Sequence, residues 1–371
     1  MKKANTIPLA ALAAVCLAAL AGCSSGSSDS DPTASIVKAW TWVSGSSSRN
    51  ASGVYNGTAV PGARGFSVSW IDSAGDLWLF GGVGYDSSGS FDALNDLWKY
   101  DVSEDNWSWV SGSDTINASG VYSGTAVPGA RSYSVSWIDS AGDLWLFGGW
   151  GYDSLVSNVY LNDLWKYDVS ADSWSFVSGS SSIGAWGVYS DTAVPGARYS
   201  SVNWIDSAGD LWLFGGRGCN SVGSDGNLND LWKYDVSENS WSYVSGSSSI
   251  GASGTYSGTA VPGARNASVS WIDSAGDLWF FGGYGYDSSG SEGNLNDLWK
   301  YDVSEGSWSF VSGSSSINAS GVYSGTVVPG ARYGSISWID SAGDLWFFGG
   351  WGCDSLGSEG DLNDLWKYGE Q

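Results

Sequence analysis

The chain of 371 residues contains no histidine. This absence excludes Ser-His-Asp and Cys-His catalysis, histidine general bases and the usual histidine-rich zinc or copper sites. The sequence also lacks a P-loop and a dinucleotide-binding glycine motif, because its Gly-Gly pairs precede polar loops rather than helix N-termini. We therefore expect no metal and no cofactor.

Basic residues are also scarce. Only 15 Lys and Arg stand against 38 Asp and Glu, which gives a formal net charge of −23. Affinity for nucleic acids depends largely on Lys and Arg that neutralise phosphates. We expect no nucleic-acid partner.

The chain has four cysteines, and two of them lie near the N-terminus. The other two, Cys219 and Cys353, occupy one repeat position in two different copies of the repeat described below. A disulfide requires Cα atoms within about 7 Å. The two thiols can pair only if their segments converge on a common axis.

The N-terminal segment has the features of an export signal. Lys2 and Lys3 precede an apolar run over 7–21, which is too short for a confident membrane-spanning helix. The sequence at 20–23, Leu-Ala-Gly-Cys, resembles the lipobox of bacterial lipoproteins. This resemblance implies cleavage before Cys23, lipidation of its thiol and a place in the bacterial cell envelope, with the outer membrane or cell surface favoured. An ordinary signal or anchor with a chance cysteine is the alternative.

The sequence divides into three parts. Residues 1–22 are the expected lipoprotein signal peptide, and residues 23–36, rich in Ser and Asp, are expected to form a flexible tether. From about residue 37 to 369 the chain repeats with a period of 67. The period is marked by Trp40, Trp107, Trp174, Trp241 and Trp308.

The last copy stops at Tyr368, just before its own tryptophan would follow. Trp40 and its neighbours supply the missing piece. A chain whose first segment completes its last repeat predicts a closed ring rather than an open solenoid.

Each copy contains four short strand-like runs rich in β-branched and aromatic residues, with turn residues at their boundaries. In the first copy they are 67–71, 76–80, 96–100 and 107–110. Gly75 stands where a tight hairpin between the first two runs needs a positive φ. The pattern predicts an all-β fold.

The motif within each copy resembles the kelch repeat. Phe80-Gly81-Gly82 is followed by Asn95 to Tyr100, with Trp107 seven positions after that tyrosine. The resemblance implies a five-bladed kelch-type β-propeller, whose last blade is completed by the N-terminal strand. The period of 67 exceeds the usual kelch length of about 50, and five blades are fewer than the six or seven typical of the family.

Residues that break the repeat frame are the candidates for function. The position after Gly-Gly is Val83 in the first copy and holds Trp, Arg, Tyr and Trp in the others, and one further tryptophan lies out of frame in a long connection. We expect these residues on loops at one face of the propeller, where aromatics and Arg are the usual anchors of recognition. Neutral drift among duplicated loops is the alternative. The candidates are Trp150, Trp186, Arg217, Tyr284 and Trp351.

An in-frame arginine follows Pro-Gly-Ala in every copy, as Arg198 does in the third. Two alternatives are open for these arginines. Either the five cations ring the channel mouth and bind an anion, or each arginine pairs with the in-frame aspartate of Asn-Asp-Leu-Trp, such as Asp230. A buried guanidinium needs a partner, and a carboxylate is its natural bidentate acceptor. We favour the structural pair.

With histidine absent, the carboxylates of Asp and Glu are the remaining candidates for catalytic groups. Paired acids catalyse glycoside hydrolysis, although nothing in the sequence marks two of them as a pair. The stretch 287–292 also offers oxygen atoms that suit Ca²⁺, without the spacing of an EF-hand. The acids in the expected loops are Asp86, Asp153, Asp225, Asp287, Glu292, Asp354 and Glu359.

The sequence thus predicts a monomeric, non-catalytic interaction module that binds a protein or a glycan and is held to the membrane by a lipid anchor. A carboxylate-based carbohydrate-active enzyme on the same scaffold is the alternative. The kelch resemblance supports the first class partly by analogy, because a fold does not fix a function.

Overall fold

The computed structural model of the chain describes residues 41–155 and 158–369, and every regular element within them is a β-strand. The expected signal peptide, the tether, Cys23 and Trp40 lie outside these residues. No helix long and apolar enough to cross a membrane occurs in the described part of the chain.

The first copy of the repeat, which we call repeat 1, forms one antiparallel sheet. Its strands are β1 (Arg64–Gly65), β2 (Val68–Ile71), β3 (Leu77–Tyr85), β4 (Phe91–Asp101) and β5 (Asn106–Ser111). Both β1 and β2 pair with β3, β3 pairs with β4, and β4 pairs with β5. The turn between β2 and β3 has Gly75 at a φ of +87°, as its position in the sequence predicts.

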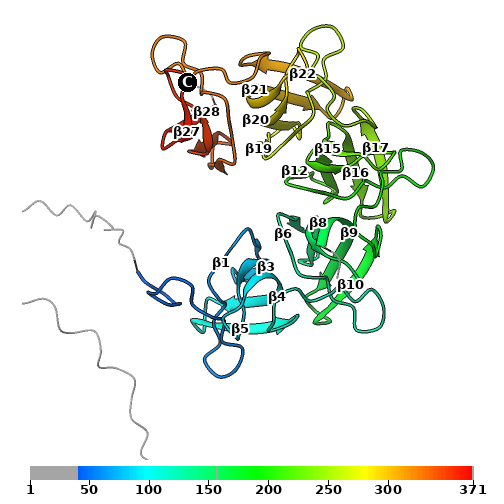
Figure 1. Cartoon of the computed structure of the whole chain (residues 1–371), viewed down its shortest axis with the longest axis vertical. Coiled ribbons are helices and arrows are strands. Elements are labelled where there is room, and N and C mark those ends of the chain that lie inside the picture. The colour runs from blue at the N-terminus through cyan, green and yellow to red at the C-terminus, as the bar shows by residue number, and fades with distance from the viewer. Residues whose placement is uncertain (1–40, 156–157, 370–371) are drawn as a thin grey trace, which may run out of the picture. The chain divides into compact units, whose positions relative to one another are not determined.

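Repeats 2 and 4 have the same pairing, whereas the strands of repeats 3 and 5 divide into two sheets each, and repeat 5 has no equivalent of β5 in the described residues (Figure 1). Repeat 2 contains β6 (Arg131–Ser132), β7 (Val135–Ile138), β8 (Leu144–Tyr152), β9 (Asn158–Asp168) and β10 (Ser173–Ser178). Repeat 3 contains β11 (Arg198–Tyr199), β12 (Val202–Ile205), β13 (Leu211–Phe214), β14 (Arg217–Cys219), β15 (Asp225–Asn227), β16 (Leu231–Asp235) and β17 (Ser240–Ser245).

The last two copies complete the series. Repeat 4 contains β18 (Arg265–Asn266), β19 (Val269–Ile272), β20 (Leu278–Tyr286), β21 (Glu292–Asp302) and β22 (Ser307–Ser312). Repeat 5 contains β23 (Arg332–Tyr333), β24 (Ile336–Ile339), β25 (Leu345–Phe348), β26 (Trp351–Cys353), β27 (Glu359–Asp361) and β28 (Leu365–Tyr368).

In repeats 1, 2 and 4 the second and third predicted strands are longer than the sequence indicates, and in repeats 3 and 5 separate short strands take the place of these extensions. In repeat 1, β3 and β4 continue past a bulge between Phe80 and Gly82, and only a short turn over 86–90 separates them. The prediction of a long loop between these strands is therefore wrong. Its residues form the far end of the sheet instead, because the two strands and β1 satisfy one another's backbone groups there.

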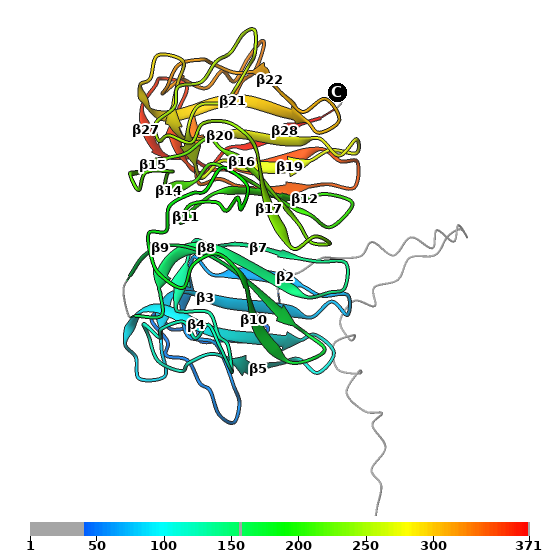
Figure 2. The ribbon, with the colours of Figure 1, turned by 90° about the vertical axis from the view of Figure 1, so that its right-hand side faces the viewer.

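The core lies between neighbouring sheets. One face of repeat 1, with Trp70, Trp78 and Phe80, packs against Leu146 and Trp165 of repeat 2. Equivalent clusters join repeats 2 and 3, 3 and 4, and 4 and 5. Figure 2 shows β2, β7, β12 and β19, the strands that meet from one sheet to the next, side by side. Each large apolar side chain buried here contributes about 1.5–3 kcal/mol.

A row of backbone hydrogen bonds also links the repeats. The amide of Tyr133 donates to the carbonyl of Phe66 (3.2 Å), and the same bond recurs from Ser200 to Tyr133, Ala267 to Ser200 and Gly334 to Ala267. All five residues have a positive φ, between 52° and 68°. These unfavourable conformations in non-glycine residues persist because the bonds between repeats hold them.

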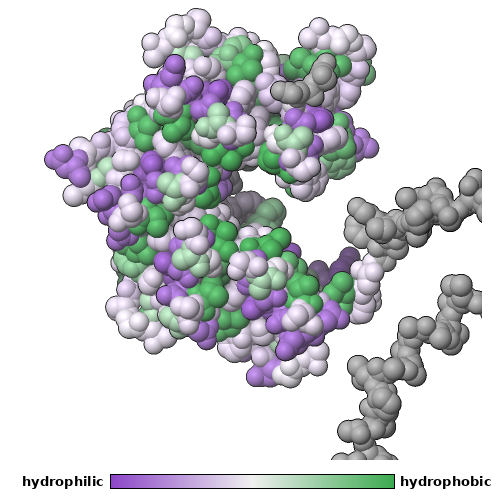
Figure 3. Space-filling view, turned by 180° about the vertical axis from the view of Figure 1, so that it is seen from behind, coloured by the Kyte–Doolittle hydropathy of each residue, from purple (hydrophilic) through white to green (hydrophobic). Residues whose placement is uncertain are grey.

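The described residues do not show a closed ring. No apolar cluster within them joins repeat 5 to repeat 1, and Trp338 is 51% exposed, whereas its equivalent Trp70 in repeat 1 is 5% exposed. Figure 3 shows a hollow between the first and the last repeats. The described residues 41–43 form no strand, and β28 has no fourth strand beside it in this part of the chain.

Candidate functional site

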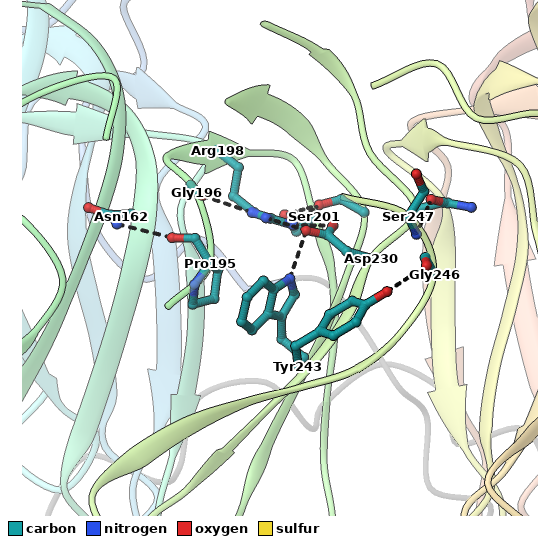
Figure 4. A network of polar contacts seen from close by, with 12 residues as sticks. Asn162, Pro195, Gly196, Arg198, Ser201, Asp230, Tyr243, Gly246 and Ser247 are labelled. Carbon is teal, nitrogen blue, oxygen red and sulfur yellow. Dashed lines mark hydrogen bonds and ion pairs between the residues drawn. The ribbon is translucent and has the colours of Figure 1, made fainter. Parts of the chain in front are cut away.

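The in-frame arginines are structural. In repeat 3, Arg198 donates two hydrogen bonds to Asp230, Nη1 to Oδ1 at 2.7 Å and Nη2 to Oδ2 at 2.8 Å. Tyr189 and Trp232 also donate to Asp230 Oδ2, at 2.6 and 2.7 Å. Arg198 also donates from Nε to the carbonyl of Gly196 (Figure 4) and from Nη1 to the carbonyl of Gly215.

We call this unit the Arg–Asp latch. Its charges are almost fully buried, with the Arg198 and Asp230 side chains 1% and 0% exposed. Burial acts to lower the pKa of Arg198, but the charge and hydrogen bonds of Asp230 outweigh it and raise the pKa. The structural pairing is thus confirmed and the ring of free cations at a channel mouth is wrong. The equivalent pairs are Arg64–Asp96, Arg131–Asp163, Arg265–Asp297 and Arg332–Asp364.

Several of the residues that vary between repeats come together on one small patch of each sheet. They hold three positions: the one after the latch arginine, the one after Gly-Gly, and the one two before Asn-Asp. Directly paired residues place their side chains on the same face of a sheet. We call these positions the variable rim; from repeat 1 to 5 they are Gly65, Val83, Ala93; Ser132, Trp150, Tyr160; Tyr199, Arg217, Asn227; Asn266, Tyr284, Asn294; and Tyr333, Trp351, Asp361.

Three aromatic rings meet where repeat 2 adjoins repeat 3. Tyr160 stacks on Tyr199 with ring centroids 5.5 Å apart, and Trp150 meets both rings edge to face at 5.3 and 5.9 Å. The hydroxyl of Tyr160 donates to Asp225 at 2.5 Å. Burial and the hydrogen bond to Asp225 raise the pKa of Tyr160 to about 12, so it remains a neutral donor at physiological pH.

The rim continues across the next two junctions through polar contacts. Asn227 donates to Glu292 at 2.9 Å and accepts from Asn266 at 2.7 Å, which joins repeats 3 and 4. Asn294 donates to Glu359 across the junction of repeats 4 and 5, at 3.5 Å. Tyr284 and Tyr333 meet there with ring centroids 5.8 Å apart.

The structure places four of the five predicted site residues on the rim. Trp150, Arg217, Tyr284 and Trp351 lie on β8, β14, β20 and β26, so the prediction that they lie on loops is wrong. Only Trp186 is on a loop. It is exposed and lies against Gly223, in the turn where the rim strands of repeat 3 end.

The partners of these residues were not predicted from the sequence. Tyr199 and Tyr333 follow a latch arginine, and Tyr160, Asn227 and Asn294 precede Asn-Asp. Comparing the five copies at these two positions reveals the same variation as at the position after Gly-Gly. What the sequence does not show is that three separate segments are neighbours in space.

Two of the candidate acids organise turns. Asp86 accepts backbone N–H groups from Ser88 and Ser90 at 2.8 and 2.9 Å and from Ile116 at 3.2 Å. Asp287 does the same in repeat 4. Burial acts to raise the pKa of both carboxyl groups, but these hydrogen bonds outweigh it and lower the pKa.

Asp153 and Asp354 take the same turn position in repeats 2 and 5, and the other three candidate acids, Asp225, Glu292 and Glu359, lie on strands. Among the described residues, no three acids or cysteines are grouped as a metal would require. Because the oxygens of Asp287 already accept protein N–H groups, the stretch 287–292 has little left to offer Ca²⁺. Cys219 and Cys353 are buried and form no disulfide with each other.

Comparison with known proteins agrees with the strand pattern. Residues 140–180 match the Kelch motif and span most of repeat 2. The chain also resembles a solved structure entitled "Structure of YjhT", with a TM-score of 0.53, 16% identity, and coverage of 83% of this chain and 82% of that one. At this identity the likeness concerns the fold alone. No curated protein matches the sequence significantly. The matched segment recurs in full at the same position in three other copies, and its first part recurs in the fifth, so the kelch motif found at 140–180 describes the repeated unit of this chain.

Proposed function

We propose that the chain is a non-catalytic interaction module that binds a protein or a glycan through its variable rim. One observation carries this proposal: three of the most variable positions in these near-identical repeats are direct neighbours across three strands. Drift has no reason to gather on paired positions of separate segments. Binding residues gather where a rigid scaffold presents them.

The chemistry of the rim supports recognition. Trp150 and Trp351 are exposed, and Arg217 and Tyr284 lie between them in chain order. Trp, Tyr and Arg supply most of the binding energy at protein interfaces, because they combine a large apolar area with hydrogen-bonding groups. Buried partners such as Tyr160 hold them in place.

We further propose that the repeats are five propeller blades and that the N-terminal segment completes the last one. Trp308 on β22 contacts Phe214, Phe280 and Tyr301, with ring centroids 5.2, 5.5 and 5.0 Å away. The equivalents one repeat later, Phe281, Phe347 and Tyr368, line a cavity of about 300 Å³ beside β28. The residue in phase with Trp308 that this cavity suits is Trp40.

Closure also supplies partners for exposed groups at the two ends of the series. In repeat 5 the exposed Ile336, Trp338 and Leu365 hold the positions that are buried as Val68, Trp70 and Leu97 at the first junction. A contact between repeats 5 and 1 buries them and adds a fifth bond, from Phe66 to Gly334, to the row of backbone hydrogen bonds. It also removes exposed sheet edges.

We also propose that the protein is a lipid-anchored, monomeric component of a bacterial envelope. The lipobox-like sequence ending at Cys23 supports this, and the tether of 23–36 separates the lipid from the propeller. A Cys23→Ala variant is expected to leave the membrane fraction. If the variant stays in the membrane fraction, the proposal of a lipid anchor on Cys23 is wrong.

The function is tested with the full chain in mild detergent, on a glycan array and against the surface proteins of the same cell. Trp351→Val, Arg217→Tyr and Trp150→Val copy residues from other repeats at the same position, so the fold tolerates them. Binding that weakens in at least one of these variants supports the rim. Binding that is unchanged in all three refutes it. Trp109→Ala is the control, because Trp109 is an exposed aromatic residue on β5, away from the rim.

A further inference from the structure

The junction of repeats 2 and 3 has the strongest concentration of recognition chemistry on the rim. Trp150 is 36% exposed although Tyr160 and Tyr199 support its ring from the side. Tyr160 is buried and joins the two repeats through Asp225. The indole is thus held in one orientation while part of its surface faces solvent, which is the arrangement of a stacking platform.

Arg217 and Asp225 form a loose ion pair beside this platform. Arg217 Nε is 3.9 Å from Asp225 Oδ2, and the two side chains are 43% and 47% exposed. The pair is long and solvated, in contrast to the Arg–Asp latch of the same repeat, and exposed pairs of this kind contribute little to stability. A ligand hydroxyl can therefore replace the contact at small cost. Arg217 then donates and Asp225 accepts, as a sugar diol requires.

The charge distribution narrows the class of ligand. At this junction Arg217 and Asp225 balance each other. Farther along the rim, Glu292, Glu359 and Asp361 add negative charge. The latch arginines are buried against their own aspartates and have no charge to offer an anion. An anionic sugar or a phosphate is therefore repelled, and a neutral sugar is not.

A basic peptide is the other ligand that an acidic, aromatic rim attracts. At the junction of repeats 2 and 3 this ligand is disfavoured, because the carboxylate beside Trp150 already faces Arg217. A lysine or arginine of a partner would lie next to a like charge. A neutral polyol has no such conflict.

We propose that Trp150, Arg217 and Asp225 form a binding site for a neutral, hexose-containing glycan. The flat, apolar face of one sugar ring lies on the Trp150 indole, and two neighbouring hydroxyls bond to Arg217 and Asp225. Shallow aromatic sites with a few fixed polar groups are suited to such ligands. This inference rests on the proposed function of the rim and specifies its ligand.

Calorimetric titration of the full chain in mild detergent tests the proposal. The probes are the neutral hexaoses of glucose, mannose and N-acetylglucosamine, with hexagalacturonate, sialyllactose and an octalysine peptide as charged counterparts. We expect saturable binding of at least one neutral hexaose and none of the charged probes. Trp150→Val and Asp225→Asn should each weaken that binding by about tenfold or more, while Trp109→Ala leaves it unchanged.

Three results overturn the proposal. The first is neutral binding that Trp150→Val does not weaken, and the second is silence of all neutral hexaoses. The third is a charged probe that binds in a manner dependent on Trp150.

If no sugar binds but rim variants still lose their binding to a surface protein, only the glycan assignment is wrong. If rim variants change no interaction at all, the proposed function fails as well. Trp150→Phe keeps an aromatic face, and recovery of part of the affinity in this variant separates stacking from mere space filling.

Discussion

Removal of one latch arginine is the sharpest test of how this fold is held together. In Arg198→Ala, the carboxylate of Asp230 stays in a site where it is 0% exposed and loses its counter-charge. Breaking a buried ion pair by removing one partner costs about 3–5 kcal/mol. Tyr189 and Trp232 continue to donate to Asp230 and offset part of this cost. Because whole domains are stable by only about 5–15 kcal/mol, the effect is large.

Two further variants distinguish the cost of leaving one charge buried without its partner from the cost of truncating the arginine side chain. In Arg198→Ala combined with Asp230→Ala no charge is left buried, so we expect this variant to be more stable than the sum of the two single changes predicts. Arg332→Ala should cost about as much as Arg198→Ala if the N-terminal segment completes the last blade. Its partner Asp364 is 17% exposed in the described residues, and the added strand covers this side of repeat 5.

The assay is urea unfolding followed by tryptophan fluorescence and by far-ultraviolet circular dichroism, with the change in midpoint as the readout. Both arginine variants should be less stable than the wild type, and a markedly smaller loss in Arg332→Ala than in Arg198→Ala would indicate that repeat 5 stays open to water. A free energy of unfolding for Arg198→Ala within about 0.5 kcal/mol of the wild type, the range of ordinary surface substitutions, refutes the reasoning. The arginines would then be available for anion binding after all.

Three other outcomes are expected. Trp40→Ala should lower the free energy of unfolding by about 3–5 kcal/mol, as for other buried aromatics. Deletion of 37–44 should lower the melting temperature further or cause aggregation. An unchanged melting temperature in both variants contradicts closure of the ring. Burial acts to raise the pKa of Asp364, but hydrogen bonds from Arg332, Tyr323 and Trp366 outweigh it and hold the pKa well below the ordinary range. This contribution to stability is complete above about pH 3.9 and is lost as the pH falls below that value, so the urea midpoint should decline only in acid; a decline beginning near neutrality contradicts it. Trp351→Val should leave the melting temperature unchanged and weaken any ligand bound near repeat 5; a lower melting temperature assigns Trp351 to packing.

Much of the fold follows from the sequence, because the repeat supplies its own reference. The strands were predictable from β-branched and aromatic residues, and the pairing of Arg198 with Asp230 followed from two in-frame charges that cannot be buried alone. The latch hydroxyl of Tyr189 was missed although a tyrosine recurs at this position in every copy, because it lies in a connection without the pattern of a strand. No local pattern marks it as a partner of Asp230, which lies 41 residues later.

The candidate site was only half predictable. The position of Arg217 was found because it breaks the frame, but its surroundings were taken for a loop. Strands such as β14 and β15 are three residues long and contain Gly, Asn and Asp, which are poor strand formers. They are strands only because backbone partners lie on both sides. Such pairing is a property of the assembled sheet and leaves no alternation of apolar residues in the sequence.

The separation between the Arg–Asp latch and the variable rim has a genetic consequence. The repeats share their period of 67 and most of their buried residues, so gene conversion between two repeats preserves the reading frame, the number of repeats and the core. Such an exchange moves a set of rim residues from one position around the sheets to another in a single event. The chain can thus acquire new combinations of surface chemistry without passing through unfolded intermediates, and point mutation needs only to refine them.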